Sequence, residues 1–241
     1  MTPVRALGEV GSTSAEARAA FERGEDGPVW FQADRQTAGY GRRGRRWHGG
    51  EGNLFATLLM PQALPLRDGA PAAWAFSTSL AVRDACISAG IEPATLTLKW
   101  PNDVLLRGAK VAGILVELLT AQPRAASAFG IGINLASAPS VAAYRTAALA
   151  VGADAGQVLT DLDGSLHGWL ARWNEEGLVP LREAWLDAAH GLGERLTARL
   201  PGAEISGIFE GIDADGTLLL RTGAGLHRVT AGDVFFSGRP A

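Results

Sequence analysis

Cysteine is almost absent from this chain. Cys86 is the single cysteine among 241 residues, which excludes an internal disulfide and fits a reducing compartment. It lies in a helical pattern, so we expect a small buried hydrophobic residue rather than a nucleophile. The four histidines are scattered without the spacing of metal ligands, which argues against a zinc site.

Long apolar runs and an excess of positive charge are also missing. No run approaches the roughly 20 apolar residues of a membrane span, and residues 1–10 lack the apolar core of a signal peptide. A net charge of −3 and a pI near 5.8 argue against general binding to nucleic acid or to a membrane surface. These absences predict a cytoplasmic protein. The length of 241 residues is enough for one large domain, or for a main domain with a small appendage.

Two familiar nucleotide-binding patterns are not found either. The segment Gly130–Asn134 reads GIGIN, but no third glycine follows and no helix opens after it, so it is not a dinucleotide fingerprint. The chain also has no phosphate-loop Gly-Lys-Ser/Thr sequence. There is no internal repeat.

The most informative stretch that is present covers residues 39–52, GYGRRGRRWHGGEG. It holds six glycines, four arginines and one tryptophan. Glycine lets a backbone approach a ligand closely, and arginine offers a permanently charged fork for phosphate or carboxylate. A loop this rich in glycine is costly to order, so we expect it to close over an anion rather than to serve only as a connection.

The remaining pattern predicts alternating strands and helices followed by an all-β segment. The capping-box pattern Thr13-x-x-Glu16 predicts a helix to about Arg23. Further helices are expected at 72–89, 162–173 and 181–189, and strands at 28–33, 54–60, 95–100, 104–106, 111–119 and 129–135. Residues 136–156 are expected to be a loop with a partial helix. From residue 193, short strands separated by glycine-rich turns predict a small antiparallel barrel. The expected architecture is a mixed α/β catalytic domain at 1–192 and a small β domain at 193–241.

Four clusters could carry chemistry. They are Gly11–Ser14, Gln36 with the loop 39–47, Lys99–Asp103 with Lys110 and Gly113, and Gly130–Asn134. Each alone has a structural alternative: a helix cap, a solvated charged loop, an ordinary Pro-Asn-Asp turn, or a strand weakened by glycines.

Together and in this order, the four clusters resemble the biotin protein ligases. The strongest elements are GYGRRGRRW, KWPNDVLLRGAKVAGILVEL and GIGIN, with SGIFEGID at 206–213 in the last domain. The resemblance covers about residues 8 to 237. It implies an α+β fold in which a mixed-sheet domain of the class II synthetase and biotin–lipoate ligase kind precedes an SH3-like barrel.

The resemblance also implies a reaction. Members of the family join biotin to ATP, giving biotinyl-5′-AMP and pyrophosphate, and then transfer biotin to one lysine of a biotin carboxyl carrier protein or domain. It implies ATP and Mg²⁺ as cofactors, biotin as substrate, and catalysis by Lys110, Arg42 and Asp103. Asp103 is also the expected Mg²⁺ anchor.

Further residues are carried over by their match to the family's motifs. Those implied at biotin are Ser12, Thr13, Gln36, Gly39, Arg42, Lys110, Gly113, Leu115, Gly130 and Gly132. Those implied at ATP are Arg42, Arg45, Trp47, Asn102, Asp103, Lys110 and Asn134.

The chain departs from the family's pattern at two positions. Tyr40 stands where the loop commonly has arginine, and Ser14 stands where asparagine is common. The Ser-Thr pair comes about ten residues after Met1, which leaves no room for the DNA-binding domain of some bacterial members. We therefore expect a ligase without repressor function. The resemblance leaves a homodimer open.

Two alternatives come from other functions. A lipoate or octanoate ligase or transferase shares the fold of the main domain, but its usual glycine-rich loop and His-Asp pair are not visible, and KWPND favours biotin. A non-catalytic module that senses biotin or binds nucleic acid is the second. The acidic charge balance argues against the nucleic-acid version.

Overall fold

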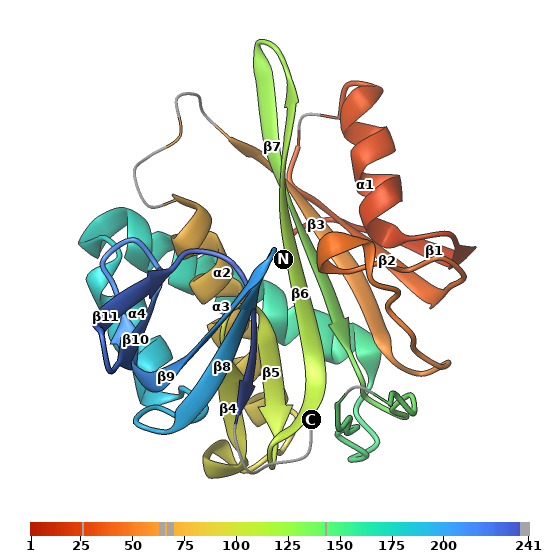
Figure 1. Ribbon diagram of the computed structural model, residues 1–241. Helices are drawn as coiled ribbons and strands as arrows, with labels where there is room; N and C mark the ends of the chain where they lie inside the picture. Colours follow the sequence, from red (N-terminus) through yellow and green to blue (C-terminus); the bar gives the residue numbers. More distant parts are fainter. Residues whose placement is uncertain (26, 63–65, 67–69, 143, 237–241) are drawn as a thin grey trace.

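The computed structural model describes residues 1–25, 27–62, 66, 70–142 and 144–236, and it is built around one mixed sheet of seven strands (Figure 1). In spatial order the strands are β1 (Val4–Val10), β2 (Val29–Gln36), β3 (Leu54–Gln62), β7 (Arg124–Ile133), β6 (Ala109–Ala121), β5 (Asp103–Leu106) and β4 (Leu96–Lys99). β1 runs parallel to β2, and all other neighbours are antiparallel.

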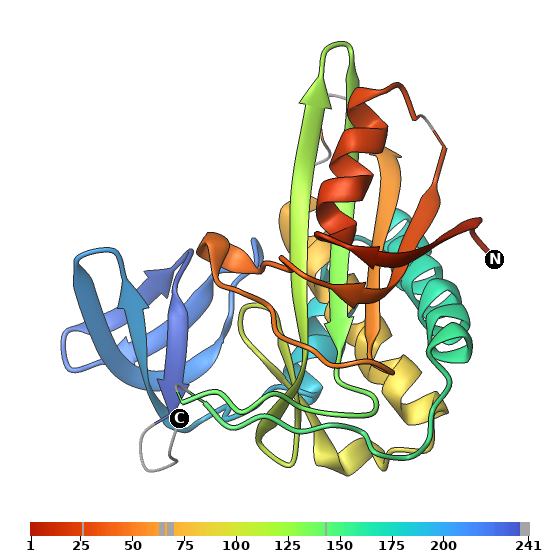
Figure 2. The same cartoon turned by 90° about the vertical axis from the view of Figure 1, so that its right-hand side faces the viewer.

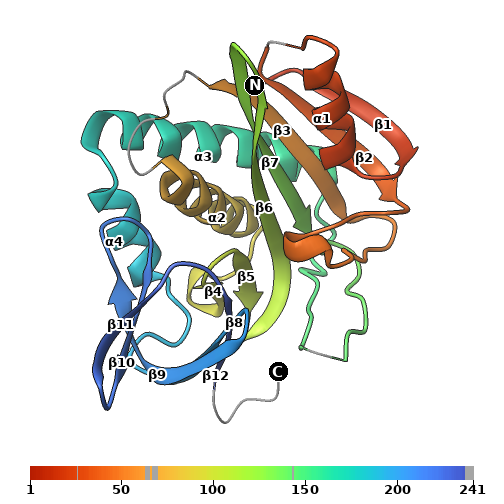
Figure 3. The same ribbon diagram turned by 45° about the horizontal axis from the view of Figure 1, so that its top comes forward.

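Helices cover the two faces of this sheet unequally. α1 (Thr13–Glu22) packs on one face, against β2, β3 and β7. α2 (Ala70–Ser88) and α3 (Ala155–Glu176) cover the other face, with α4 (Val179–Asp187) beside them (Figure 3). Alternation along the strands explains the division, because Ala56 and Leu58 of β3 join the α2 core while Leu59 joins the α1 core. Because α1 packs mainly against β2, β3 and β7, part of the sheet face that carries α1 is left uncovered by helices.

The main core confirms several expectations from the sequence. Trp173 and Trp185 are buried in it, and Trp74 packs edge-on against Phe129 with 6.2 Å between ring centroids. Cys86 is fully buried, and this burial raises the pKa of its thiol to about 12. Cys86 is thus a core residue, as predicted. None of the helices among the described residues has the length and apolar character that a membrane crossing needs.

The C-terminal segment forms a separate antiparallel sheet of five strands, which confirms the predicted small β domain. In spatial order these are β11 (Gly225–Val229), β10 (Leu218–Thr222), β9 (Ala203–Ile212), β8 (Arg195–Leu200) and β12 (Asp233–Phe236). The sheet docks on the main domain through Gly216, where a Cβ would lie 2.5 Å from the Cβ of Ala72 in α2. Trp100 adds an indole hydrogen bond of 3.3 Å to the Gly216 carbonyl oxygen.

The structure departs from the predicted elements in three places. β1 was not predicted, because the sequence VRALGEV is mostly exposed and lacks the apolar alternation of a half-buried strand. The helix at Thr13 is confirmed, but the capping box is wrong: Ser12 is the N-cap residue and makes no side-chain cap bond. The described residues of 136–154 form a loop, and α3 begins at Ala155, earlier than predicted.

Candidate functional site

The uncovered part of the α1 face has a floor of small residues from three central strands. Gly130 of β7 lies opposite Thr57 of β3 and Leu115 of β6. The next row along β7 pairs Gly132 with Gly113 of β6. These positions share one face, because residues two apart on a strand point the same way. The three glycines have no side chains, so this part of the sheet face is low, and a pocket of the molecule lies over it.

One side chain of the glycine-rich loop lies directly on this floor. A Cβ at Gly132 would lie 2.5 Å from Trp47 Cε2, and one at Gly113 would lie 2.7 Å from Trp47 Cζ3. Both glycines are therefore required by the close approach of the indole ring. The Trp47 Nε1–H group is buried and has no hydrogen-bond partner among the described residues. A buried donor in this state is costly unless a ligand satisfies it.

A buried polar cluster closes the pocket at the start of α1. Gln36 Oε1 accepts hydrogen bonds from the Thr13 backbone N–H at 2.8 Å and from Thr13 Oγ1 at 3.2 Å. Thr57 Oγ1 donates to Thr13 Oγ1 at 2.9 Å, and Ser14 Oγ lies 3.2 Å from Thr57 Oγ1. A Cβ at Gly130 would lie 2.7 Å from Ser14 Oγ. Ser14 thus lines the pocket, although it departs from the family's common asparagine.

The opposite end of the pocket is cationic. The chain has only two lysines, Lys99 and Lys110, and both line the pocket. Lys110 Nζ forms an ion pair of 2.6 Å with Asp103 Oδ1, and both side chains are about four-fifths buried, with 17% and 20% of their surface exposed. The Lys110 ammonium also lies 5.4 Å from the centroids of the Trp47 and Tyr144 rings. Burial lowers the pKa of Lys99.

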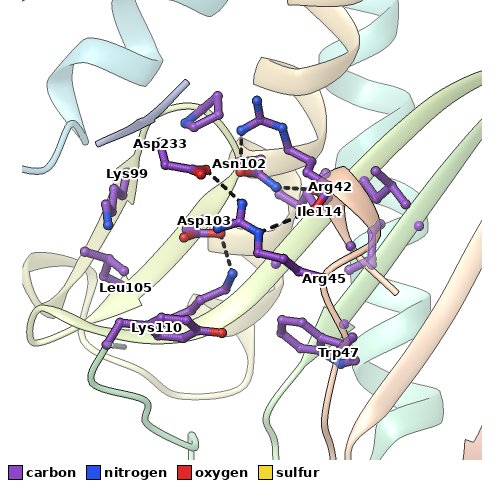
Figure 4. A pocket seen from close by; sticks show the side chains of 18 of the residues that line it. Arg42, Arg45, Trp47, Lys99, Asn102, Asp103, Leu105, Lys110, Ile114 and Asp233 are labelled. Atoms are coloured by element: carbon purple, nitrogen blue, oxygen red, sulfur yellow. Dashed lines mark hydrogen bonds and ion pairs between the residues drawn. The ribbon is translucent and has the colours of Figure 1, made fainter. Parts of the chain in front are cut away.

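Arg42 approaches the same end from the glycine-rich loop, as Figure 4 shows. Its guanidinium donates to Asn102 Oδ1 at 3.4 Å and to the Gly232 carbonyl oxygen at 3.3 Å. Asn102 is fixed in turn, because its Nδ2 donates to the Ile114 carbonyl oxygen at 2.6 Å. Burial lowers the pKa of Arg42, but the group stays charged at neutral pH.

The tip of the loop meets the C-terminal domain at Asp233. Arg45 Nη2 lies 2.8 Å from Asp233 Oδ1, and Arg43 Nη1 lies 3.2 Å from Asp233 Oδ2. Figure 2 shows this loop, in orange, reaching the blue C-terminal strands. The aromatic residue Phe235 also lines the pocket, with Lys99 Nζ 5.7 Å from its ring centroid. The C-terminal domain therefore forms one wall of the site.

Most residues that the sequence singled out come together in this pocket. Those that line it are Thr13, Gln36, Arg42, Arg45, Trp47, Asn102, Asp103, Lys110, Gly113, Leu115, Gly130 and Gly132. Three others do not. Ser12 is buried at the N-terminus of α1, and Gly39 lies behind Gln36, where a Cβ would be 2.8 Å from Gln36 Nε2. Asn134 is 2% exposed and donates to the Ala147 carbonyl oxygen at 3.1 Å, so it supports the neighbouring loop instead.

Sequence reasoning missed several residues of the site, among them Lys99, Thr57, Tyr144 and Asp233. Lys99 belonged to a cluster that was recognised, but no role was assigned to it. Thr57 lies in an apolar strand, and its zero exposure beside Thr13 appears only in three dimensions. Tyr144 and Asp233 come from segments without a motif. Asp233 is separated from Arg45 by 188 positions and from Arg43 by 190 positions, so no sequence signal could have paired them.

This arrangement suits two linked anions with a polar, uncharged group at one end. Lysine and arginine can bind a carboxylate and phosphates together, while hydroxyl and amide groups bind a neutral head. Among the described residues no group of three or more His, Cys, Asp or Glu side chains could hold a metal ion.

Comparison with known proteins identifies the family. The model of the biotin/lipoate A/B protein ligase family matches residues 23–134, and the model of the biotin protein ligase C-terminal domain matches residues 191–237. A biotin–[acetyl-CoA-carboxylase] ligase from Paracoccus denitrificans is 42% identical over 96% of this chain and 100% of its own length. The bifunctional ligase/repressor BirA from Bacillus subtilis is 31% identical over 84% of this chain, and the match spans 64% of that relative.

A solved structure agrees over nearly the whole chain. The biotin protein ligase from Aquifex aeolicus in complex with biotin and ATP superimposes with a TM-score of 0.80 and 26% identity, covering 98% of this chain and 100% of that one. The glycine floor, the arginine loop and the C-terminal β domain thus occur in a chain that matches a biotin–[acetyl-CoA-carboxylase] ligase and a solved biotin protein ligase over nearly its whole length, and this chain belongs to the biotin protein ligase family.

Proposed function

We infer that this protein is an ATP-dependent biotin protein ligase. It forms biotinyl-5′-AMP from biotin and ATP with release of pyrophosphate, and then transfers biotin to a lysine of a biotin carboxyl carrier domain. The observation that carries this inference is the pocket that joins a polar, uncharged end at Thr13 and Gln36 to a cationic end at Lys110 and Arg42. The 42% identity to a biotin–[acetyl-CoA-carboxylase] ligase supports the same conclusion.

We propose that the polar end binds the head of biotin. Thr13, Ser14 and Gln36 offer hydroxyl and amide groups there, and the missing side chain of Gly130 allows the Ser14 hydroxyl to lie against the floor of the pocket. Ser12 supports this end by opening α1 rather than by lining the pocket. The unpartnered Trp47 Nε1–H suits an acceptor atom of a ligand lying on the glycine floor.

The cationic end favours attack of the biotin carboxylate on the α-phosphate. A carboxylate oxygen forms a bond to the α-phosphorus while the bond to the bridging oxygen of pyrophosphate breaks. The barrier is largely electrostatic, because two anions must approach each other. Lys110 and Arg42 offset this repulsion in a pocket that excludes much of the solvent, and they hold the two groups in line. When the substrates bind, the ion pair between Lys110 and Asp103 must break so that the Lys110 ammonium can contact the substrate oxygens.

We propose that Mg²⁺ enters with the triphosphate and that Asp103 is its protein ligand. The residues fit such a group, because magnesium in nucleotide sites usually takes one or two carboxylates and completes its shell with phosphates and water. Asp103 supplies one carboxylate at the phosphate end, and Asn102 lies next to it with its amide already fixed. Magnesium would neutralise charge on the phosphates.

The adenylation half-reaction tests this proposal without a carrier protein. Purified protein with Mg-ATP is expected to release pyrophosphate only when biotin is added, and to form biotinyl-5′-AMP. Lipoate is run in parallel, because the matching family model includes lipoate ligases. Pyrophosphate release that depends on lipoate and not on biotin would contradict the proposal.

We propose three finer properties from the sequence. They are location in the cytoplasm, absence of nucleic-acid binding, and a domain boundary between residues 192 and 193. The boundary is supported by the start of β8 at Arg195 and by the C-terminal family model, which begins at residue 191.

A further inference from the structure

The glycine-rich loop has a narrow, hydrogen-bonded base. The Trp47 N–H donates to the Gly39 carbonyl oxygen at 2.9 Å, and the Gly41 N–H donates to the Arg45 carbonyl oxygen at 2.8 Å. Tyr40 and Arg46 pair as an isolated antiparallel bridge between these bonds. A loop with this much glycine loses much conformational entropy on closing, so the closed form needs contacts that hold it.

Tyr40 makes one such contact through its side chain. Its hydroxyl donates to Glu117 Oε2 at 3.3 Å, and Glu117 Oε1 accepts from Arg18 Nη2 at 2.8 Å. Burial and the negative charge of Glu117 raise the pKa of Tyr40, so the hydroxyl is a protonated donor at neutral pH. The two hydrogen bonds, Tyr40 to Glu117 and Arg18 to Glu117, thus link the loop base to β6 and α1.

These two elements also carry the polar end of the pocket. Glu117 lies two positions after Leu115 on β6, so both point to the same face of the sheet. Arg18 lies on α1, the helix that begins at Thr13. The chain of contacts therefore fixes the loop base relative to the walls that hold biotin, while Arg42, Arg43 and Arg45 fix its tip at the C-terminal domain.

We propose that Tyr40 is a positioning residue that holds the loop closed over biotinyl-5′-AMP through its hydrogen bond to Glu117. This inference rests on the proposed ligase function. Tyr40 does not touch the reacting atoms; it lowers the rate at which the loop opens and releases the intermediate before transfer. Losing the hydroxyl should therefore change the fate of the intermediate more than its formation.

The first test measures how much intermediate escapes. Tyr40→Phe removes only the hydroxyl, and we expect the ratio of free biotinyl-5′-AMP to biotin transferred to a carrier domain to rise about 5-fold, as for the loss of one ordinary hydrogen bond. Glu117→Ala should have a similar effect. Because both act through one contact, the double variant should not exceed the larger single effect. Additive effects would overturn the proposed role of Glu117 as the partner of Tyr40.

A second measurement is independent of activity. Trypsin cuts after arginine, and the loop carries four arginines within residues 42–46, so the rate of cleavage there reports loop opening. Tyr40→Phe should be cut faster than the parent protein, both with and without biotin and Mg-ATP. Glu176→Gln, which breaks the exposed Arg172–Glu176 pair on α3, serves as the control and should match the parent.

The outcomes separate this inference from the proposed function. Equal cleavage and an equal release ratio in Tyr40→Phe and the parent would overturn the role of Tyr40, even if the protein is a ligase. If the parent forms no adenylate, the proposed function fails, and the cleavage rates alone decide whether Tyr40 holds the loop.

Discussion

Lys110 sits where several contacts meet. It pairs with Asp103 at 2.6 Å, faces two aromatic rings at 5.4 Å, and its backbone N–H donates to the Arg145 carbonyl oxygen at 2.8 Å. These contacts aim its ammonium group into the pocket. At the residue scale, Lys110 is therefore the group on which the electrostatic argument depends most.

We expect Lys110→Ala to reduce adenylate formation by about 100- to 1000-fold, the usual effect of removing one group that stabilises charge in a transition state. The measurement is biotin-dependent release of pyrophosphate at saturating ATP. Lys110→Arg, which keeps the charge but not the geometry, should retain part of the rate. A normal rate in Lys110→Ala would show that the charge of this residue is not used.

Arg42 is expected to control retention of the intermediate. Arg42→Gly loses the hydrogen bonds to Asn102 and Gly232 and adds another glycine to the loop, so free biotinyl-5′-AMP should escape. Escape can be followed as biotin attached to the lysines of an added bystander protein. The enzyme has only two lysines of its own, so it competes little with the bystander for the released intermediate.

Arg107→Gly is the matched control for this experiment. Arg107 lies outside the loop, is exposed and does not line the pocket, and its φ of 50° is one that glycine adopts freely. Its bystander labelling should stay near that of the parent. Equal labelling by Arg42→Gly and the parent would exclude a role for Arg42 in retention.

The residues of the site were predictable where local chemistry marks them. Glycines, arginines and the Lys99–Asp103 segment combine residue types that a simple structural element does not need, and several of them line the pocket, as do Thr13 and Gln36. Ser12, Gly39 and Asn134 were included because their neighbours in sequence belong to the motifs, yet none of them lines the pocket. Ser12 is the N-cap residue of α1, Gly39 packs against the Gln36 side chain, and Asn134 follows the end of β7 and donates to the Ala147 carbonyl oxygen. Asp233 was unpredictable, because its role depends on how one domain docks on another.

At the scale of elements, Asp163 of α3 links three parts of the main domain. Its carboxylate accepts hydrogen bonds from the Trp30 indole of β2 at 2.8 Å and from the Thr2 backbone N–H at 2.9 Å. Burial acts to raise the pKa of Asp163, but these hydrogen bonds and the charge of His167 outweigh it, so the pKa is lowered. The stabilisation is thus present above the ordinary pKa of about 3.9 and is lost as pH falls through the folded-state value.

We expect Asp163→Asn to lower the free energy of unfolding at pH 7 by about 1.5–3 kcal/mol, the usual worth of hydrogen bonds to a charged group. The difference from the parent should shrink as pH falls below about 4. Denaturant unfolding between pH 3 and 7 measures both, with Asp161→Asn on the same helix as the control. A difference that does not change with pH would contradict a role for the charge.

Replacing either of two glycines by alanine should change stability, but with opposite signs. Gly168 of α3 faces open space, with no neighbouring atom within 4 Å of where a Cβ would lie, so Gly168→Ala should stabilise the protein by about 1 kcal/mol through helix propensity. Gly216→Ala should destabilise it, because φ is +86° and the new Cβ would lie 2.5 Å from that of Ala72. Thermal unfolding measures both changes. Stabilisation by Gly216→Ala would contradict the docking of the two domains.

Helices and buried strands were predictable because their apolar patterns are strong. β1 was not, since its place at the sheet edge is fixed by parallel pairing with β2 rather than by burial. The predicted capping box failed for a related reason: the Thr13 hydroxyl is bonded to Gln36 and Thr57 instead of capping its own helix. In both cases a contact distant in sequence overrides the local signal.

At the scale of the whole molecule, the site lies between the two domains. The main sheet supplies the glycine floor and the Lys110–Asp103 ion pair, and β12 of the C-terminal domain supplies Asp233 and Phe235. The loop with Arg42 and Arg45 bonds to Gly232 and Asp233, so it connects the two domains across the pocket. A loop in this position would protect a hydrolysis-prone adenylate from water.

Transfer of biotin to a carrier is the most direct test of the central claim. The protein would be mixed with Mg-ATP, labelled biotin and a purified biotin carboxyl carrier domain, with lipoate in a parallel sample. The account predicts ATP-dependent label from biotin on the carrier lysine, and none in a carrier whose lysine is replaced. Label from lipoate instead of biotin, or no label and no pyrophosphate release with either compound, would contradict it.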